Sequence, residues 1–246
     1  MFRSILALSL LVSSASAEDK KPLQMDEASK TLVDAWLKKE YNPGTDGLKK
    51  ASFKIKVSMQ SQMRAMTANA DYTFDAGAEG AKGKLVWDNE MVGGRLAKKG
   101  WSVEDINAKF DPRGWAVWLA GCKLTATAGD AGTEIKVEGK NRDNVTGVTF
   151  DKDGVFTKMR FGIDMMGQKI PAELTFKYEK DGDRYRNMGW DFAMDIPGMG
   201  KVNTTTKLTY VTVGKYKIIK KAVDTTTMAG QPAGTTTFDF TEHTAE

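Results

Sequence analysis

Cysteine and histidine are almost absent from this chain of 246 residues, which contains one of each. The single cysteine, Cys122, leaves no internal disulfide, so the fold must rest on side-chain packing. The single histidine, His243, lies in the C-terminal segment "TEHTAE". A Ser-His-Asp triad, a Cys-His nucleophile or a His-based zinc site would each need this one residue. We therefore expect a protein that is not an enzyme and that has no cofactor and no metal.

Charge of one sign is not concentrated anywhere in the sequence. The chain has 36 Lys and Arg against 32 Asp and Glu, a formal net charge of +4, and the two signs are mixed along its length. A nucleic-acid-binding protein would gather basic residues into a stripe or patch. The charge pattern therefore predicts no nucleic-acid partner.

Long hydrophobic runs are also missing, apart from a short one at the N-terminus. Arg3 precedes the apolar run 5–12, and Ala15-Ser16-Ala17 has the small-x-small form of a cleavage site. The run is too short to span a bilayer, so the pattern predicts a secretory signal peptide at 1–17 rather than a membrane helix. Because no Cys lies near the cleavage site, we expect no lipid anchor. The mature chain 18–246 is expected to be one domain, exported to the periplasm or cell exterior, without a transmembrane segment.

Motifs that superficially fit ligand sites are better explained as turns. The glycine-rich "GDAGTE" lacks the Lys-Ser/Thr of a phosphate-binding loop. The segments "DKDG" and "KDGD" lack the long ligand series of a calcium loop and fit Asp-Gly hairpin turns. Asn144 and Asn203 begin N-glycosylation sequons, which matter only in a eukaryotic source.

Two segments have the pattern of helices. In 24–40, Val33, Trp36 and Leu37 recur at helical spacing. A short helical lid is expected at 102–121, where Pro112 suits a helix start and Gly121 a helix end. Its apolar residues are Trp115, Trp118 and Leu119. They fit either a helix packed on a sheet or a helix that covers a cavity.

Most of the remaining chain alternates between apolar and polar residues, as half-buried strands do. The segment 53–60 is the clearest example, and "MVGGRLAKKG" (91–100) is also expected to be a strand. From residue 145 onward the strands form an antiparallel meander over 145–150, 155–165, 170–179, 184–196, 202–213, 216–226 and 234–241. The fold class predicted is mainly β, with a strongly curved antiparallel sheet that is open or a half-barrel.

Methionines gather at alternate turns of this meander. Because consecutive turns fall at opposite ends of a sheet, one end is charged and the other carries Met165, Met166, Met199 and Met228. Met63 and Met66 join this end if the first hairpin, "MQSQMRAMTA", points the same way. Three interpretations stay open: plugs that close the end of the sheet, an apolar rim around a cavity mouth, and a Cu(I) site. Copper is the weakest, because the methionines are spread over separate turns.

The order of elements resembles the periplasmic lipoprotein-carrier superfamily, the half-barrel group of LolA-like and LppX-like proteins. The local likeness lies in "WAVWLAG" and in "VTGVTFDKDGVFTKMRFGIDMMGQKIPAELTFKYEK". The resemblance implies a sheet and helices that enclose an apolar cavity for acyl chains. The residues that it places on the lid or the concave face are Trp115, Trp118, Leu119, Phe161, Phe176, Trp190 and Phe192.

The resulting hypothesis is an exported, non-enzymatic protein whose apolar cavity binds lipid or the acyl chains of a lipoprotein. The partner expected is therefore a lipid or an acylated protein. The alternative is a structural or interaction protein of the envelope that docks a protein partner through the methionine-rich rim. The threonine-rich strands "NTTTKLTYVTV" and "DTTTMAGQPAGTTTFDF" depart from the family pattern.

Overall fold

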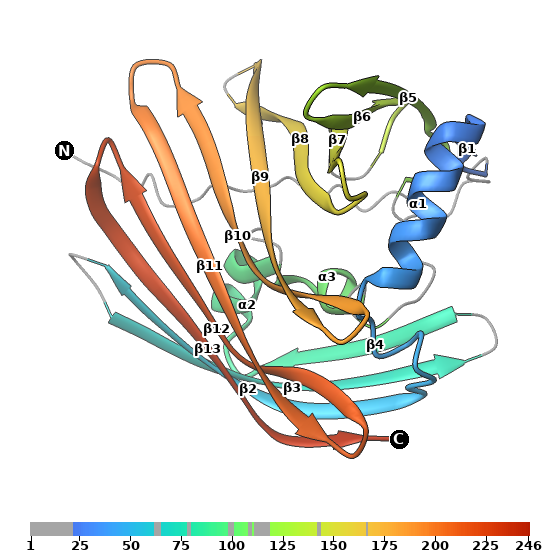
Figure 1. Ribbon diagram of the computed structural model, residues 1–246. Helices are drawn as coiled ribbons and strands as arrows, with labels where there is room; N and C mark the ends of the chain where they lie inside the picture. The colour runs from blue at the N-terminus through green and yellow to red at the C-terminus, as the bar shows by residue number, and fades with distance from the viewer. Residues whose placement is uncertain are drawn as a thin grey trace.

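One large curved β-sheet dominates the computed structural model, which describes residues 22–61, 65–77, 80–97, 101–107, 110, 119–141, 144–165 and 167–246 (Figure 1). Its 13 strands run in the order β1-β5-β6-β7-β8-β9-β10-β11-β12-β13-β2-β3-β4. The strands are β1 (Gln24–Met25), β2 (Lys50–Ser61), β3 (Ala65–Gly77), β4 (Gly80–Trp87), β5 (Lys123–Gly129), β6 (Gly132–Glu138), β7 (Val145–Asp151), β8 (Phe156–Met165), β9 (Gln168–Asp181), β10 (Arg184–Ile196), β11 (Gly200–Val213), β12 (Tyr216–Met228) and β13 (Gln231–Ala245). The helices are α1 (Glu27–Lys39), α2 (Glu90–Leu96) and α3 (Val103–Asn107).

Antiparallel pairing joins all neighbours except β1 and β5, which are parallel. The meander expected from the sequence is present as β7 to β13. The C-terminal strand β13 then pairs with β2, with Phe238 opposite Val57. The sheet stays open, with β1 and β4 as its edges. The predicted fold class, a mainly β, curved and open antiparallel sheet, is confirmed.

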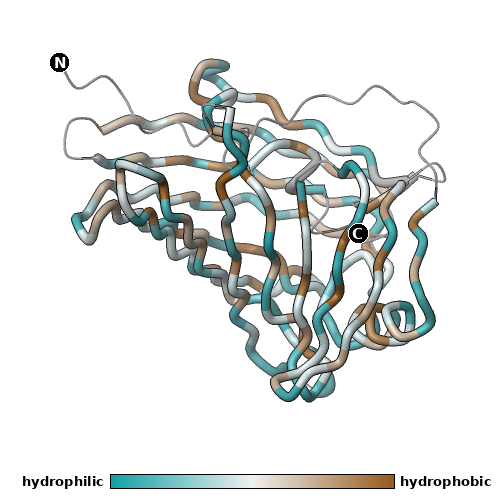
Figure 2. Tube along the Cα trace, turned by 90° about the horizontal axis from the view of Figure 1, so that it is seen from above, coloured by the Kyte–Doolittle hydropathy of each residue, from teal (hydrophilic) through white to brown (hydrophobic). Residues whose placement is uncertain are grey.

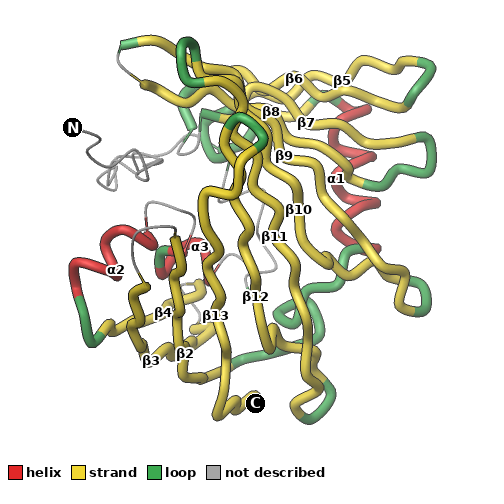
Figure 3. The backbone as a smooth tube through the Cα atoms, turned by 90° about the vertical axis from the view of Figure 1, so that its left-hand side faces the viewer, coloured by secondary structure: helices red, strands yellow, loops and turns green. Residues whose placement is uncertain are grey.

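The two-residue period of the sequence explains which face of each strand is buried. In β2, Phe53, Ile55 and Val57 are almost completely buried, whereas Lys54 and Lys56 are exposed. Figure 2 shows the same alternation of hydrophobic and hydrophilic residues along many strands. We call the buried side the inner face, and α1, α2 and α3 lie on this side (Figures 1 and 3).

Helix α1 is close to the helix expected at 24–40. Asp26 is its N-cap, and the Asp26 carboxylate accepts a hydrogen bond of 2.7 Å from the backbone N–H of Ser29. The same carboxylate accepts a bond of 3.0 Å from the backbone N–H of Ala126 in β5. A side chain in the N-cap position thus also fastens the start of the helix to the sheet.

The strand expected at 91–100 was wrong, because helix α2 occupies Glu90–Leu96. Asn89 caps this helix by accepting a bond of 3.2 Å from the backbone N–H of Val92. Val92 and Leu96, four residues apart, are fully buried on one side of the helix. Two adjacent glycines lower the helix propensity of the segment and conceal this period in the sequence.

The short helical lid expected at about 102–121 lies only partly within the described chain. Within that range the structure describes the helix Val103–Asn107, and Phe110 and residues 119–121 lie in turns. Residues 111–118, including Trp115 and Trp118, lie outside the described residues, as do 1–21, Met63 and Met166.

Two hydrophobic clusters occupy the inner face. The α1 cluster joins α1 to β5–β11 and includes Val33, Trp36, Leu119, Cys122, Leu124, Ile135, Phe150, Phe156, Met159, Phe161, Ile163, Met194 and Val202. The α2–α3 cluster joins α2 and α3 to β2, β3 and β11–β13 and includes Phe53, Ile55, Val57, Tyr72, Val92, Leu96, Trp101, Phe110, Leu208, Ala222, Phe238 and Phe240. One sheet therefore supports two separate cores.

Candidate ligand-binding face

Three of the aromatic residues proposed for the apolar site lie together on β8, β9 and β10. The ring centroids of Phe161 and Phe192 are 6.0 Å apart. Phe176 contacts the same cluster through Phe156, with 4.8 Å between centroids. Phe161 is 6% exposed, whereas Phe176 and Phe192 are only half-buried at the edge of the α1 cluster. The structure thus gathers these three side chains on the inner face.

Trp190 lies on the same face but belongs to the other cluster. It is directly opposite Phe176 in the β9–β10 register, yet its half-buried indole packs against the α2–α3 cluster. A bulge at Asn187 and Gly189 precedes it. Gly189 has a φ of +132°, and a Cβ there would lie 2.0 Å from the carbonyl oxygen of Thr206. The glycine allows β10 and β11 to approach closely just before Trp190.

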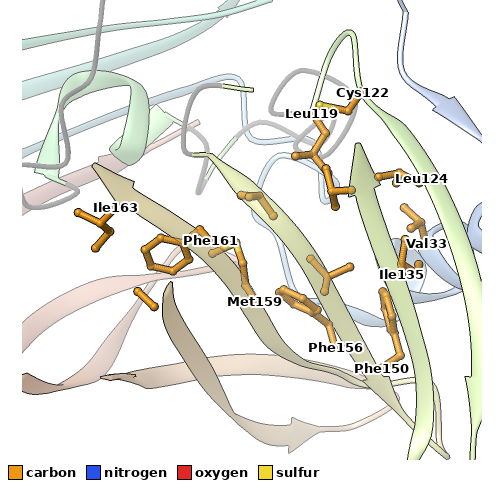
Figure 4. Close-up of a cluster of buried hydrophobic side chains, with 14 of the residues drawn as sticks. Val33, Leu119, Cys122, Leu124, Ile135, Phe150, Phe156, Met159, Phe161 and Ile163 are labelled. Atoms are coloured by element: carbon orange, nitrogen blue, oxygen red, sulfur yellow. The ribbon is translucent and has the colours of Figure 1, made fainter. Parts of the chain in front are cut away.

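Leu119 is part of the α1 cluster, where it is fully buried (Figure 4). Figure 4 shows Leu119 and Cys122 beside Leu124 and above the aromatic side chains of the neighbouring strands. Because no part of Leu119 is exposed, its side chain packs inside the core and offers no surface to a ligand. The two tryptophans predicted beside it in the sequence cannot be placed, since residues 111–118 lie outside the described chain.

The methionine-bearing hairpins lie at one end of the sheet, as the turn order predicts. Met165 ends β8, Met228 ends β12, and Met199 lies in the turn between β10 and β11. The β13–β2 pairing brings Gly234 opposite Ser61, so the β2–β3 hairpin that carries Met66 points the same way. In Figure 1 the tips of β10–β11 and β12–β13 lie side by side at the upper left.

The methionine side chains at these tips are half-buried and divide between the two cores. Met165, Met199 and Met228 pack against the α1 cluster. Met66 is opposite Met59 in the β2–β3 register, and both pack against the α2–α3 cluster. These contacts fit the interpretation that the methionines plug the end of the sheet. Each side chain is also partly exposed, so the interpretation as an apolar rim stays open as well.

A polar stretch interrupts the inner face between the two cores. Along β11 the inner positions read Val202, Thr204, Thr206 and Leu208, from the α1 cluster to the α2–α3 cluster. The register shift of this strand against β12 lies beyond them, after Thr209, so all four side chains share a face. Two apolar residues therefore flank two threonines.

The neighbouring strand β12 repeats this order in the opposite chain direction. Its inner positions are Met228, Thr226, Asp224 and Ala222, again from the α1 cluster to the α2–α3 cluster. On β13, Thr236 is opposite Asp224. We call the set Thr204, Thr206, Asp224, Thr226 and Thr236 the polar belt.

Hydrogen bonds connect the members of the polar belt. The hydroxyl oxygens of Thr204 and Thr226 are 3.0 Å apart and share one hydrogen bond. The buried hydroxyl of Thr206 donates to Asp224 at 2.7 Å, and the indole Nε1 of Trp101 donates to the same carboxylate at 3.4 Å. Trp101 also stacks on Phe238, with 3.9 Å between centroids. Sequence reasoning missed this group, although the three Thr-Thr-Thr runs were its signal.

Sequence reasoning also left Trp36 without a site role. Its side chain is fully buried on α1 beside Phe156, Tyr178 and Tyr185. Burial raises the pKa of Tyr178 well above its ordinary value, so the phenol stays neutral. The helical period that included this tryptophan was the available signal.

Two of the surface depressions formed by described residues lie away from the proposed aromatic residues. The first has a volume of about 470 Å³ and lies at the turns after β5 and β7, beside Leu32 and Asp153. The second, of about 400 Å³, is lined by Lys54, Asp71, Trp87 and their neighbours on β2–β4. An enclosed apolar cavity around Phe161, Phe176 and Phe192 remains a hypothesis.

Among the side chains that the structure describes, no group of three or more His, Cys, Asp or Glu residues could hold a metal ion. The Nε2 atom of His243 lies 3.0 Å from the carbonyl oxygen of Ile219, a contact with the backbone. No helix in the described ranges is long and apolar enough to cross a membrane.

Comparisons with known proteins find similarity in fold. No protein-family model and no curated protein matches the chain. The chain is similar to a domain from Vibrio parahaemolyticus assigned as an outer membrane lipoprotein-sorting protein, at 9% identity over 88% of this chain and 91% of that chain, with a TM-score of 0.37. It is also similar to a DUF1329 family protein from Desulfovibrio piger, at 7% identity over 88% and 92% of the two chains, with a TM-score of 0.35.

Proposed function

We propose that this protein is an exported, non-enzymatic carrier that binds lipid, or the acyl chains of a lipoprotein, on the inner face of its sheet. The observation that carries the proposal is a group of apolar side chains that stay half-buried on that face: Leu174, Phe176, Trp190, Phe192, Met199 and Met228. Covering them would remove apolar surface from water, worth about 0.8 kcal/mol for each CH₂ of a bound chain. An acyl chain needs such area without strict polar geometry.

The proposed site consists of the aromatic residues on the strands, with the segment around residue 119 as its cover. Phe161, Phe176, Trp190 and Phe192 would contact the ligand or support those that do. Leu119 would form the wall behind them, and the lid role of Trp115 and Trp118 belongs to the same proposal. The methionines at the hairpin tips, Met63, Met66, Met165, Met166, Met199 and Met228, would form a rim around the entrance.

Export is part of the proposal. The signal-peptide pattern at 1–17 supports secretion, with the mature domain 18–246 acting in the periplasm or outside the cell. A carrier in that compartment would meet lipid or acylated proteins of the envelope. Non-enzymatic action is supported by the composition, since the chain has one His and one Cys.

The first experiment is native mass spectrometry of the mature protein purified from its own envelope, followed by organic extraction. We expect an additional mass that extracts as lipid, which would also name the ligand class. A clean unliganded mass, combined with no uptake of added phospholipid or acylated peptide, would contradict the carrier function.

A pair of variants tests the location of the site. Phe192→Ala removes a half-buried ring from the inner face, and we expect it to weaken binding of a fluorescent fatty acid about tenfold, or about 1.4 kcal/mol. Val86→Ala changes a residue that is 49% exposed on the edge strand β4 and should leave binding unchanged. Equal affinity of the Phe192→Ala variant and the wild type would move the site away from β10.

One observation favours a second candidate, a protein that docks an envelope partner through its rim. The hairpins carrying Met66, Met165, Met199 and Met228 point to the same end of the sheet, and methionine suits surfaces that accept varied apolar partners. If the mass-spectrometry experiment finds no lipid, this candidate predicts that exchanging the rim methionines for Ser abolishes capture of an envelope protein.

A further inference from the structure

The polar belt divides the proposed lipid-binding face into two apolar halves. From Val202 to Leu208 the inner positions of β11 span about 20 Å, at 3.4 Å per residue. The two central positions are threonines, and the apolar ends belong to different cores. Val202, Thr206 and Leu208 are buried, so a ligand on this strand would reach the half-buried Thr204 at the boundary between the two apolar cores.

The belt retains hydrogen-bonding capacity on its partly exposed side. Thr204 and Thr226 carry one hydroxyl hydrogen each, and their mutual bond of 3.0 Å uses one of the two. Both residues are half-buried, as is Thr236. Hydrocarbon laid over these hydroxyls would remove them from water without offering a replacement hydrogen bond. The belt thus favours a ligand with an oxygen acceptor at this point.

The electrostatics of the same positions disfavour an anionic group. On β11, β12 and β13 the inner positions from 202 to 208, from 222 to 228 and from 234 to 240 contain no Lys or Arg. Their ionisable member is the acid Asp224. A phosphate headgroup binds best where Arg, Lys or a cluster of backbone N–H groups faces it. These strands supply hydroxyls instead.

We propose that the inner face selects an uncharged amphiphile whose ester or hydroxyl linkage lies between two apolar segments, a diacylglycerol being the simplest example. Its linkage would accept a hydrogen bond from the Thr204–Thr226 pair. One chain would lie toward Phe192 and Met228, and the other toward Trp190 and Met59. This inference rests on the proposed carrier function and specifies its ligand.

The test compares two lipids that differ in one group, dioleoylglycerol and dioleoylphosphatidate, by native mass spectrometry of the full mature chain. We expect dioleoylglycerol to bind at least tenfold more tightly than dioleoylphosphatidate. Equal affinity for both lipids, or tighter binding of the phosphatidate, would overturn the selectivity while leaving the carrier function in place. Uptake of neither lipid would overturn the ligand assignment, and only the additional failure of the acylated peptide in the first experiment would overturn the carrier function.

Two double variants assign the selectivity to the belt. Thr204→Val with Thr226→Val keeps the side-chain shape and the strand propensity but removes both hydroxyls, and it should reduce the preference for dioleoylglycerol about tenfold. Thr225→Val with Thr235→Val makes the same change on the opposite face, where these two residues are paired in the β12–β13 register. This control should keep the wild-type preference. The same loss in both double variants would overturn the role of the belt.

Discussion

Trp36 of α1 meets Tyr178 of β9 edge to face, with 5.0 Å between ring centroids and an interplanar angle of 73°. The indole is fully buried, and the ring centroid of Tyr185 of β10 lies 5.8 Å from that of Trp36. This one side chain therefore joins the helix to two strands of the sheet. Such aromatic pairs contribute beyond the area that they bury.

Replacing Trp36 should release α1 from the sheet. We expect Trp36→Ala to lower the free energy of unfolding by about 3–5 kcal/mol, because it empties a large buried volume. Urea denaturation at constant pH measures the change. Thr31→Ala, on the exposed side of the same helix, should stay within about 0.5 kcal/mol of the wild type. A loss below about 1 kcal/mol for Trp36→Ala would show that α1 contributes little to the α1 cluster.

Asp26 should make the stability of the protein depend on pH. Hydrogen bonds from Ser29, and then from the backbone of Ala126, hold the pKa of the Asp26 carboxyl below its ordinary value. A carboxyl with a lowered pKa in the folded state stabilises the fold above its unfolded pKa of about 3.9, and this contribution disappears as the pH falls through the lowered folded value.

The variant Asp26→Asn should accordingly unfold at a lower urea concentration than the wild type at pH 7. The difference between the two proteins should shrink as the pH falls from about 4, the unfolded pKa, through the lower pKa of the folded carboxyl. Glu27→Gln removes the adjacent acidic residue of the first turn and serves as the control. A difference between Asp26→Asn and wild type that is the same at every pH would contradict the role of the ionised carboxylate.

The two glycines of α2 should respond in opposite ways to alanine. A Cβ at Gly93 would lie 2.4 Å from Cδ1 of Trp87, whereas a Cβ at Gly94 would meet nothing within 4 Å. Gly93→Ala should therefore destabilise the protein by about 1–3 kcal/mol, as overpacked sites do. Gly94→Ala should stabilise it by about 0.5–1 kcal/mol, because alanine is the better helix former. Equal midpoints of thermal unfolding for the two variants would mean that Trp87 can move aside.

The methionines of the hairpin tips should contribute to stability according to their burial. Met228 packs against the α1 cluster, so Met228→Ser should lower the free energy of unfolding by about 1–3 kcal/mol. Met91 on α2 is 61% exposed, and Met91→Ser should change the same quantity by less than about 0.5 kcal/mol. If urea denaturation gave the same small change for both, the packing of Met228 against the α1 cluster would contribute little to stability.

Local patterns in the sequence were sufficient for the strands and for the direction of their hairpins. The alternation of apolar and polar residues predicted the bounds of β7 to β13 to within a few residues, because one face of each strand is buried and the other faces solvent. Met165 and Met228 end β8 and β12, and Met199 lies in the turn after β10, whereas the rim that the turn order predicts stays a prediction. The same analysis of alternation wrongly predicted a strand at α2. There, Val92 and Leu96 are buried at helical spacing although Gly93 and Gly94 lie between them.

The sequence by itself therefore determined the strand periods, the first helix and the polarity of the sheet ends. Only the tertiary structure decided that β13 pairs with β2, which places Phe238 opposite Val57 and brings together residues at opposite ends of the chain. It also decided that Thr204 and Thr226 meet between two cores. The physical reason is that a strand's period depends on its own residues, whereas register and partner choice depend on which distant apolar faces can be buried together.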